Sequence, residues 1–190
     1  MNNSWPFKLD HIQDWAFWKK AFTVKECNLI VDMYKKNLTK AYVFKASETS
    51  KVRKSKIKWV NPGKETDWIF KRLTDITTNL NDRFFKFDID GLFEGLQYTN
   101  YTAPGNYYGK HTDRGFNTKI RKLSISIQLT NPKKYTGGDL NLHFQNKPVT
   151  MSKEQGTLII FPSYVLHEVT PVMTGERNSL VAWVSGKNFK

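Results

Sequence analysis

The chain has 190 residues, of which 39% are hydrophobic and 14% aromatic, and it carries a formal net charge of +13. This length suits one domain that buries roughly 70% of its unfolded surface, and the apolar content argues against a disordered chain. No apolar run approaches the ~20 residues of a membrane-spanning helix, and MNNSWPFKLDHIQDW lacks the pattern of a secretory signal. The single cysteine, Cys27, excludes an internal disulfide and a cysteine metal cluster, and indicates a reducing, cytoplasmic setting.

The excess of basic residues leaves two interpretations open. It favours an anionic partner such as nucleic acid, an acidic protein or an acidic substrate. Alternatively, it is a lysine-rich surface that only aids solubility. The densest basic stretch, KVRKSKIKW at 51–59, partly alternates basic with apolar residues. This alternation predicts a half-buried strand with a solvated basic face.

Two helices are predicted in the first half of the chain, both packed against a sheet. The first lies within 23–38 and opens with Thr23 and Glu26 at capping-box spacing. Its apolar stripe consists of Leu29, Ile30, Met33 and Tyr34. The second lies within 66–85, where apolar residues recur at three- and four-residue steps: Ile69, Leu73, Ile76 and Leu80.

From about residue 88 the pattern changes to short alternating segments separated by turns. The predicted strands are 95–101, 122–130, 138–144, 156–162, 165–172 and 178–186. The predicted turns are 104–105, 131–132, 137–138 and 174–175. Many short strands with turns between them predict a sandwich, jelly roll or barrel, with the helices on one outer face. The aromatic segment 15–22 is expected to dock on the sheet.

Two histidines and one aspartate form the candidate metal site. In HTD, His111 stands two residues before Asp113, so in extended chain both side chains point to the same face. His167 lies in an otherwise apolar strand, FPSYVLHEV. Two imidazoles and one carboxylate leave coordination positions open, which suits non-heme Fe(II). Zn(II) accepts the same ligand types, so the ligands alone leave the metal open.

A candidate anion clamp begins ten residues after His167. Arg177 and Ser179 point the same way on a strand, so a guanidinium and a hydroxyl converge on one anion. A planar guanidinium binds a carboxylate through charge-assisted bonds of about 1.5–3 kcal/mol each. Together with an iron triad, this clamp predicts a dicarboxylate that reaches from Arg177 to the metal.

The order HTD, His167, RNS resembles the 2-oxoglutarate/Fe(II) oxygenases, whose metal triad is HxD…H and many of which carry an RxS clamp. The similarity runs over roughly residues 20–186, through FTVKECNLIV, VRKSKIKW, LQYTNY, RKLSISIQLTNPKKYTGGDL and FPSYVLHEVTPVMTGERNSLVAWVSG. These segments are similar to the prolyl-hydroxylase-type branch, especially its small bacterial and phage PKHD-type members. The implied fold is a double-stranded β-helix, or distorted jelly roll. It would form one domain over 1–190, with a helical and stranded part to about 87 and a core over 88–186.

The resemblance also implies a role for each site residue. The implied Fe(II) triad, which carries catalysis, consists of His111, Asp113 and His167. The implied 2-oxoglutarate pocket consists of Arg177, Ser179 and Tyr101. Tyr98 lies on the opposite strand face from Tyr101 and is the weaker candidate. Lys110 either meets the substrate or faces solvent.

The implied activity is hydroxylation of a C–H bond, coupled to conversion of 2-oxoglutarate and O₂ into succinate and CO₂. Ascorbate is a candidate for a further cofactor. The expected substrate is a peptidyl prolyl or other protein side chain, in the cytoplasm or, for a viral protein, the host cytoplasm. No membrane partner is expected, and the oligomeric state stays open.

Two other functions are carried alongside. One is the same chemistry on nucleic acid or a small molecule, which the charge supports. It requires that the basic residues 51–58, Lys110, Arg114, Lys119, Arg121 and Lys122 form one surface beside the metal. The other is a non-catalytic jelly roll that binds a metal or an anion, against which Arg177 and Ser179 argue. His143 and His11 are expected to lie outside the site.

Overall fold

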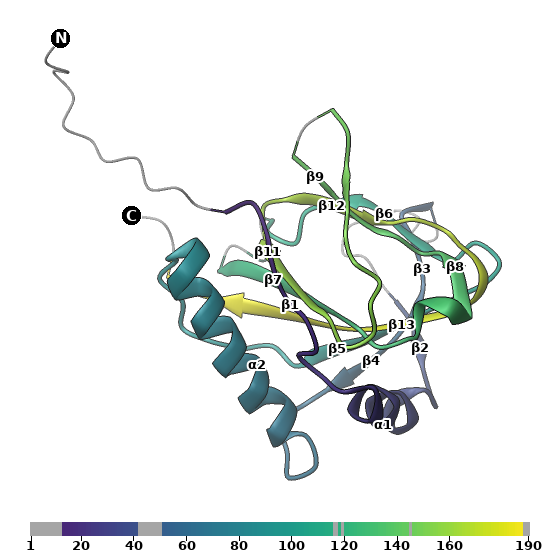
Figure 1. The fold of residues 1–190 in the computed structure, drawn as a ribbon, viewed down its shortest axis with the longest axis horizontal. Helices are drawn as coiled ribbons and strands as arrows, with labels where there is room; N and C mark the ends of the chain where they lie inside the picture. Colours follow the sequence, from purple (N-terminus) through teal and green to yellow (C-terminus); the bar gives the residue numbers. More distant parts are fainter. Residues whose placement is uncertain (1–12, 42–50, 116–117, 119, 145, 188–190) are drawn as a thin grey trace, which may run out of the picture.

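The computed structural model describes residues 13–41, 51–115, 118, 120–144 and 146–187. Two antiparallel sheets lie face to face, and two helices cover the outer face of the larger sheet (Figure 1). This is the jelly-roll arrangement that the strand pattern predicts. Within the described ranges, no helix is long and apolar enough to cross a membrane.

The larger sheet has the strand order β1-β11-β7-β13-β5-β4-β2. Its strands are β1 (Ala16–Trp18), β2 (Thr39–Lys40), β4 (Lys56–Val60), β5 (Leu96–Thr102), β7 (Arg121–Gln128), β11 (Leu158–Pro162) and β13 (Val172–Ser185), and β8 (Tyr135–Gly137) pairs with β13 beside this path. The smaller sheet has the order β10-β9-β12-β6-β3. Its strands are β3 (Arg53–Lys54), β6 (Tyr107–His111), β9 (Leu140–His143), β10 (Val149–Thr150) and β12 (Leu166–Val169).

The two predicted helices are present. In α1 (Val24–Tyr34), Thr23 and Glu26 form the expected capping box. Its buried residues are Cys27 and Ile30, whereas Leu29 is exposed, so the predicted apolar stripe is wrong at that position. In α2 (Asp67–Leu80), all four predicted apolar residues are buried. The chain then continues as a π-helical turn, Asn81–Phe85.

Three strand expectations need correction. The turn predicted at 174–175 lies inside β13, where the pairing with β8 shifts register between Val172 and Thr174. The turn predicted at 137–138 does not join two paired strands, because β8 pairs with β13 whereas β9 pairs with β12 and β10. No strand was predicted over Tyr107–His111, yet β6 carries the first candidate ligand. Segment 15–22 docks as expected, through pairing of β1 with β11.

The alternation of side chains along the larger sheet divides the core in two. On β11, Leu158 and Ile160 pack on the helix side, while Ile159 and Phe161 pack toward the smaller sheet. β7 alternates in the same way, so its polar side chains do not face the helices. They face the space between the two sheets, and the candidate site lies there.

Candidate active site

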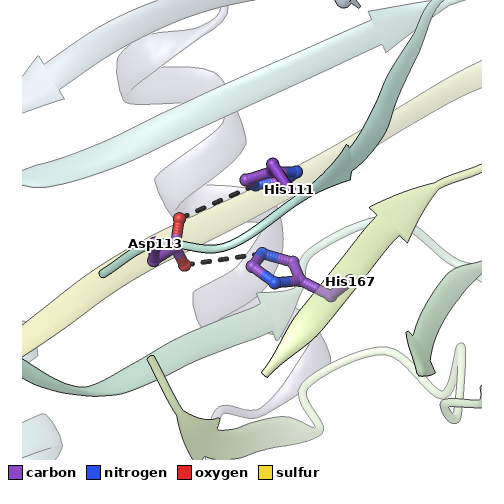
Figure 2. A group of neighbouring side chains, drawn as sticks. All are labelled: His111, Asp113 and His167. Carbon is purple, nitrogen blue, oxygen red and sulfur yellow. Dashed lines mark ion pairs between the residues drawn. The ribbon is translucent and has the colours of Figure 1, made fainter. Parts of the chain in front are cut away.

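Strands β6 and β12 bring the two predicted histidines side by side. His111 ends β6 and is the direct cross-strand partner of His167 on β12, with ring centroids 4.1 Å apart. Asp113 follows β6 and its carboxylate faces both rings (Figure 2). Oδ1 lies 3.6 Å from His111 Nε2, and Oδ2 lies 3.4 Å from His167 Nε2. The structure therefore brings together the three residues that the sequence motif singled out.

The hydrogen bonds of the two imidazoles determine which nitrogen is free. His111 Nδ1 lies 2.8 Å from Gly109 O, and His167 Nδ1 lies 2.9 Å from Val165 O. A carbonyl oxygen only accepts, so each Nδ1 carries a proton, and a neutral ring in this tautomer presents the lone pair of its Nε2. Burial and the neighbouring His167 lower the pKa of His111 to about 4, so this ring is neutral at pH 7.

The donor atoms of the triad fit a metal ion. The ligand atoms of His111, Asp113 and His167 lie within 4.8 Å of one another. Two lone pairs and a carboxylate at this separation repel one another unless a cation lies between them. Neutral imidazole and carboxylate with open positions are the donor set of non-heme Fe(II) sites. The cluster therefore fits Fe(II), although the same donors accept Zn(II).

Two buried serines hold the carboxylate of Asp113. Ser124 Oγ donates to Asp113 Oδ2 at 2.7 Å, and Ser163 Oγ lies 3.0 Å from Ser124 Oγ. The backbone N–H of Asp113 donates to Ser163 O at 3.0 Å. Burial alone would raise the pKa of Asp113, but the two imidazoles and the Ser124 hydrogen bond outweigh it and lower that pKa. The carboxylate is therefore ionised and its orientation is restricted.

Aromatic rings fix the orientation of the imidazoles. Tyr108 stacks on His111 with ring centroids 3.5 Å apart and an interplanar angle of 15°. Phe161 meets His167 edge-on, with centroids 4.8 Å apart. On the far side of Tyr108, the guanidinium carbon of Arg53 lies 4.5 Å from the ring centroid. These contacts join residues from different strands, and no motif in the sequence marks them.

Arg177 is a buried cation without a buried anion. It is 1% exposed, and its guanidinium donates to Ser179 Oγ at 3.3 Å and to Gln128 Oε1 at 3.1 Å. Its Nε has no hydrogen-bond partner, and among the described residues no carboxylate pairs with it. A buried charge is costly unless it is paired. The site therefore fits a ligand with a carboxylate.

The two candidate tyrosines lie on opposite faces of β5, as the spacing predicts. Tyr101 faces the space between the sheets, and its ring centroid lies 5.3 Å from the guanidinium carbon of Arg177. Tyr98 belongs to the helix-side core, where its hydroxyl donates to Asn178 Oδ1 at 2.7 Å. Of the two, Tyr101 is placed to contact a ligand beside Arg177.

One cavity of about 280 Å³ contains both clusters. It is lined by the triad, by Arg177, Ser179 and Tyr101, and by residues that the sequence analysis did not assign to the pocket, including Arg53, Trp59, Ser124 and Trp183. This volume is near the lower end of ligand pockets, which span about 300–1,000 Å³. A small dicarboxylate can therefore extend from Arg177 to the triad within one cavity.

The basic residues proposed as a nucleic-acid surface do not form one exposed patch. Lys122 is 4% exposed, and Arg121 forms a bidentate ion pair with Glu94. Arg53 was expected on a solvated face but is buried in the cavity wall. Lys110 is exposed and does not line the cavity, which supports the solvent alternative. Lys119 lies outside the described residues.

The remaining histidines do not contribute to the described site. His143 Nε2 lies 3.0 Å from Glu168 Oε1 and does not line the cavity. His11 lies outside the described residues.

The fold and the site define a jelly-roll protein with a His-Asp-His cluster that could hold a metal ion. Residues 96–185 match the family model of the 2OG-Fe(II) oxygenase superfamily. The matched segment is similar to that superfamily, which is the family that the sequence motifs indicated. The expected cofactors Fe(II), 2-oxoglutarate and O₂ are those of the superfamily.

The similar curated proteins are PKHD-type hydroxylases. The one from Prochlorococcus marinus (strain NATL2A) is 34% identical over 117 residues, which cover 60% of this chain and 52% of the relative. The one from Sphingopyxis alaskensis is 32% identical over 109 residues, covering 55% of this chain and 50% of the relative. The chain thus spans about half the length of the curated relatives it matches.

Solved structures confirm the fold. A Pseudomonas putida prolyl-4-hydroxylase matches with a TM-score of 0.72 at 21% identity, covering 92% of this chain and 94% of that chain. The prolyl hydroxylase of Trichoplax adhaerens, solved in complex with a hypoxia-inducible factor peptide fragment, also has a TM-score of 0.72, at 17% identity. That match covers 91% of this chain and 84% of that chain.

Proposed function

We propose that the chain is a 2-oxoglutarate/Fe(II)-dependent dioxygenase that hydroxylates a peptidyl prolyl or other protein side chain. One observation carries the proposal: a buried, unpaired guanidinium shares a cavity with a His-Asp-His cluster. In this proposal His111, Asp113 and His167 would hold Fe(II). Arg177 and Ser179 would hold the distal carboxylate of 2-oxoglutarate.

The remaining residues of the cavity would bind and orient the reactants. When bound, Fe(II), 2-oxoglutarate and O₂ supply the oxidation, in which 2-oxoglutarate is converted to succinate and CO₂ and the substrate gains a hydroxyl group. Tyr101 covers one side of Arg177 and restricts water access to it. Ser124 keeps the carboxylate of Asp113 turned toward the two imidazoles. An enclosed site strengthens these interactions because little water screens them.

A protein substrate is favoured over nucleic acid. The similar solved structures include prolyl hydroxylases, and one of them is a complex with a peptide. At the mouth of the cavity, Trp59 is 45% exposed and its ring centroid lies 6.1 Å from that of Trp183. This apolar rim suits a peptide side chain. Burial of Arg53 and Lys122 and the ion pair of Arg121 with Glu94 weaken the nucleic-acid alternative. The Arg177 clamp argues against a non-catalytic metal site. The cytoplasmic location stays a prediction.

Succinate formation tests the proposal directly. The purified chain, supplied with Fe(II), 2-oxoglutarate and ascorbate, is assayed with and without a pool of proline-containing peptides. We expect the amount of succinate to increase when peptide is added and to fall to background in His111→Ala. In Arg177→Ala, succinate formation should recover only at a much higher concentration of 2-oxoglutarate. His143→Ala is the matched control, because this histidine lies outside the cavity and should leave turnover unchanged. Failure to bind either Fe(II) or 2-oxoglutarate would contradict the proposal.

A further inference from the structure

A second cavity lies next to the candidate active site and is strongly basic. Its volume is about 320 Å³. Apart from Ala41, it is lined by Lys40, Arg53, Lys54, Ser55, Lys56 and Asn106. Among the described lining residues, four are cations and none is acidic. A concave surface of one charge concentrates ligands of the opposite charge, so this cavity, called the basic cavity below, favours an anion.

The lysines of the basic cavity are not neutralised by the described part of the chain. Lys40, Lys54 and Lys56 form no ion pair with a described carboxylate. Lys40 and Lys56 are also direct partners in the antiparallel register of β2 and β4. Like charges opposite each other destabilise a sheet. An anionic ligand would relieve this repulsion, and such local conflicts are expected at functional sites.

Arg53 joins the basic cavity to the active site. It is 8% exposed and lines both cavities. Its guanidinium donates to Gln97 Oε1 and to Ser55 Oγ, each at 2.8 Å. It also covers the outer face of Tyr108, whose ring stacks on His111. One guanidinium and one ring therefore separate the basic cavity from the metal cluster. A substrate with one side chain in the active site has its neighbouring residues within reach of the basic cavity.

The strands around the basic cavity favour an extended peptide as the anionic ligand. Among the described strands, β3 lies at an edge of the smaller sheet and β2 at an edge of the larger one. Edge strands offer free backbone groups to an added peptide strand. Lys54 and Lys56 are two residues apart, about 6.6 Å in extended chain, which matches alternate side chains of a peptide. Among the described residues no aromatic side chain lines this cavity, whereas single-stranded nucleic-acid sites combine cations with stacking aromatics.

We propose that the basic cavity binds acidic side chains of the protein substrate. The enzyme would then select an extended segment that carries Asp or Glu close to the residue to be hydroxylated. This inference rests on the proposed function, because it names the substrate class of the same active site. It also gives a role to part of the positive charge of the chain.

Fluorescence anisotropy with short synthetic probes tests this inference. The probes are a fluorescein-labelled peptide with a central proline flanked by aspartates, the same peptide with lysines, and single-stranded oligothymidylate. The full chain is loaded with Mn(II) and 2-oxoglutarate under anaerobic conditions, so binding is read without turnover. We expect the acidic peptide to bind most tightly, with an affinity that falls as salt is added.

Two double variants locate the binding site. Lys40→Gln with Lys56→Gln should weaken binding of the acidic peptide about fivefold, as expected for two partly exposed ion pairs. Lys25→Gln with Lys71→Gln is the matched control, because it removes the same charge from exposed positions on α1 and α2. Binding by this control should change less than about twofold.

The outcomes separate this inference from the proposed function. Three results would each overturn the peptide assignment. They are equal losses of affinity in the two double variants, equal affinity for the acidic and the basic peptide, and tighter binding of oligothymidylate. Succinate formation is measured separately. Turnover without a preference for the acidic peptide overturns the basic-cavity inference alone. The opposite result is acidic-peptide binding that is lost in the Lys40/Lys56 variant, with no succinate formed under any condition. It supports the basic-cavity inference and contradicts the proposed activity.

Discussion

Ser124 donates a 2.7 Å hydrogen bond to Oδ2 of Asp113, the carboxylate oxygen that faces His167. Ser124 is 1% exposed and lies on β7, whereas Asp113 follows β6, so the contact joins the two sheets. Outer partners of this kind orient metal-binding carboxylates. The contact therefore prepares the candidate metal cluster before any metal binds.

Replacing Ser124 should weaken metal binding. We expect Ser124→Ala to reduce Fe(II) or Co(II) affinity about 10–100-fold, because the carboxylate loses its orienting donor. Anaerobic metal titration followed by tryptophan fluorescence measures this. Ser126→Ala is the matched control, since Ser126 lines the same cavity from the same strand, whereas the described hydrogen bond to the Asp113 carboxylate comes from Ser124. Ser124→Thr keeps the hydroxyl and should restore most of the affinity. Equal affinities of Ser124→Ala and Ser126→Ala would contradict the role.

Arg177 should couple 2-oxoglutarate binding to stability. A ligand that binds only the folded state raises the melting temperature. We expect 2-oxoglutarate to raise the melting temperature of the Mn(II)-loaded wild-type chain. It should have little effect on the melting temperature of Arg177→Met. Without the ligand, Arg177→Met should be close to wild type in stability, because it removes a buried cation that has no anionic partner. Thermal unfolding with and without 2-oxoglutarate measures both effects. An undiminished ligand-induced shift in the variant would show that Arg177 is not the clamp.

Gly138 should be required for the position of Arg177. A Cβ at Gly138 would lie 3.0 Å from Arg177 Cδ and 2.9 Å from Val172 Cγ2. We expect Gly138→Ala to destabilise the fold by more than about 1 kcal/mol and to weaken 2-oxoglutarate binding. Gly105→Ala is the matched control: Gly105 also has positive φ, at 79°, but its Cβ would meet nothing within 4 Å. Chemical denaturation measures the loss of stability in each variant. Equal losses of stability in Gly138→Ala and Gly105→Ala would mean that the backbone conformation alone, and not contact with Arg177, explains the destabilisation.

Cys27 should be unreactive in the folded chain. Burial is the main cause, and the charge of the nearby Glu26 the second, of a rise in the pKa of the Cys27 thiol from 9.0 to about 12. The thiolate is the reactive form, so modification by a thiol reagent at pH 8 should be very slow until denaturant is added. The unfolded chain loses this proton at lower pH than the folded chain. The neutral thiol therefore favours folding below pH 9, and this contribution is lost as pH rises from 9.0 toward about 12. Rapid labelling of the native chain would contradict the burial of Cys27.

Local spacing in the sequence was sufficient to predict much of the site. His111 and Asp113 share a face because they are two residues apart, and the same holds for Arg177 and Ser179. Alternation of apolar residues predicted most core strands, and the spacing of Ile69 and its repeats predicted α2. These features depend on neighbours along the chain, so a single sequence contains them.

Contacts between distant segments were decided only by the tertiary structure. Ser124 reaches Asp113, and Tyr108 stacks on the ring of His111 against Arg53, because β7, β6 and β3 meet across the two sheets. The pairing of β8 with β13, a strand distant in sequence, is likewise a contact that the tertiary structure decides. Strand partners are selected by how the whole core packs, and no local pattern encodes that choice. The sequence by itself therefore determined the candidate ligands and the candidate clamp residues, while the tertiary structure decided which residues orient them and where the basic cavity lies.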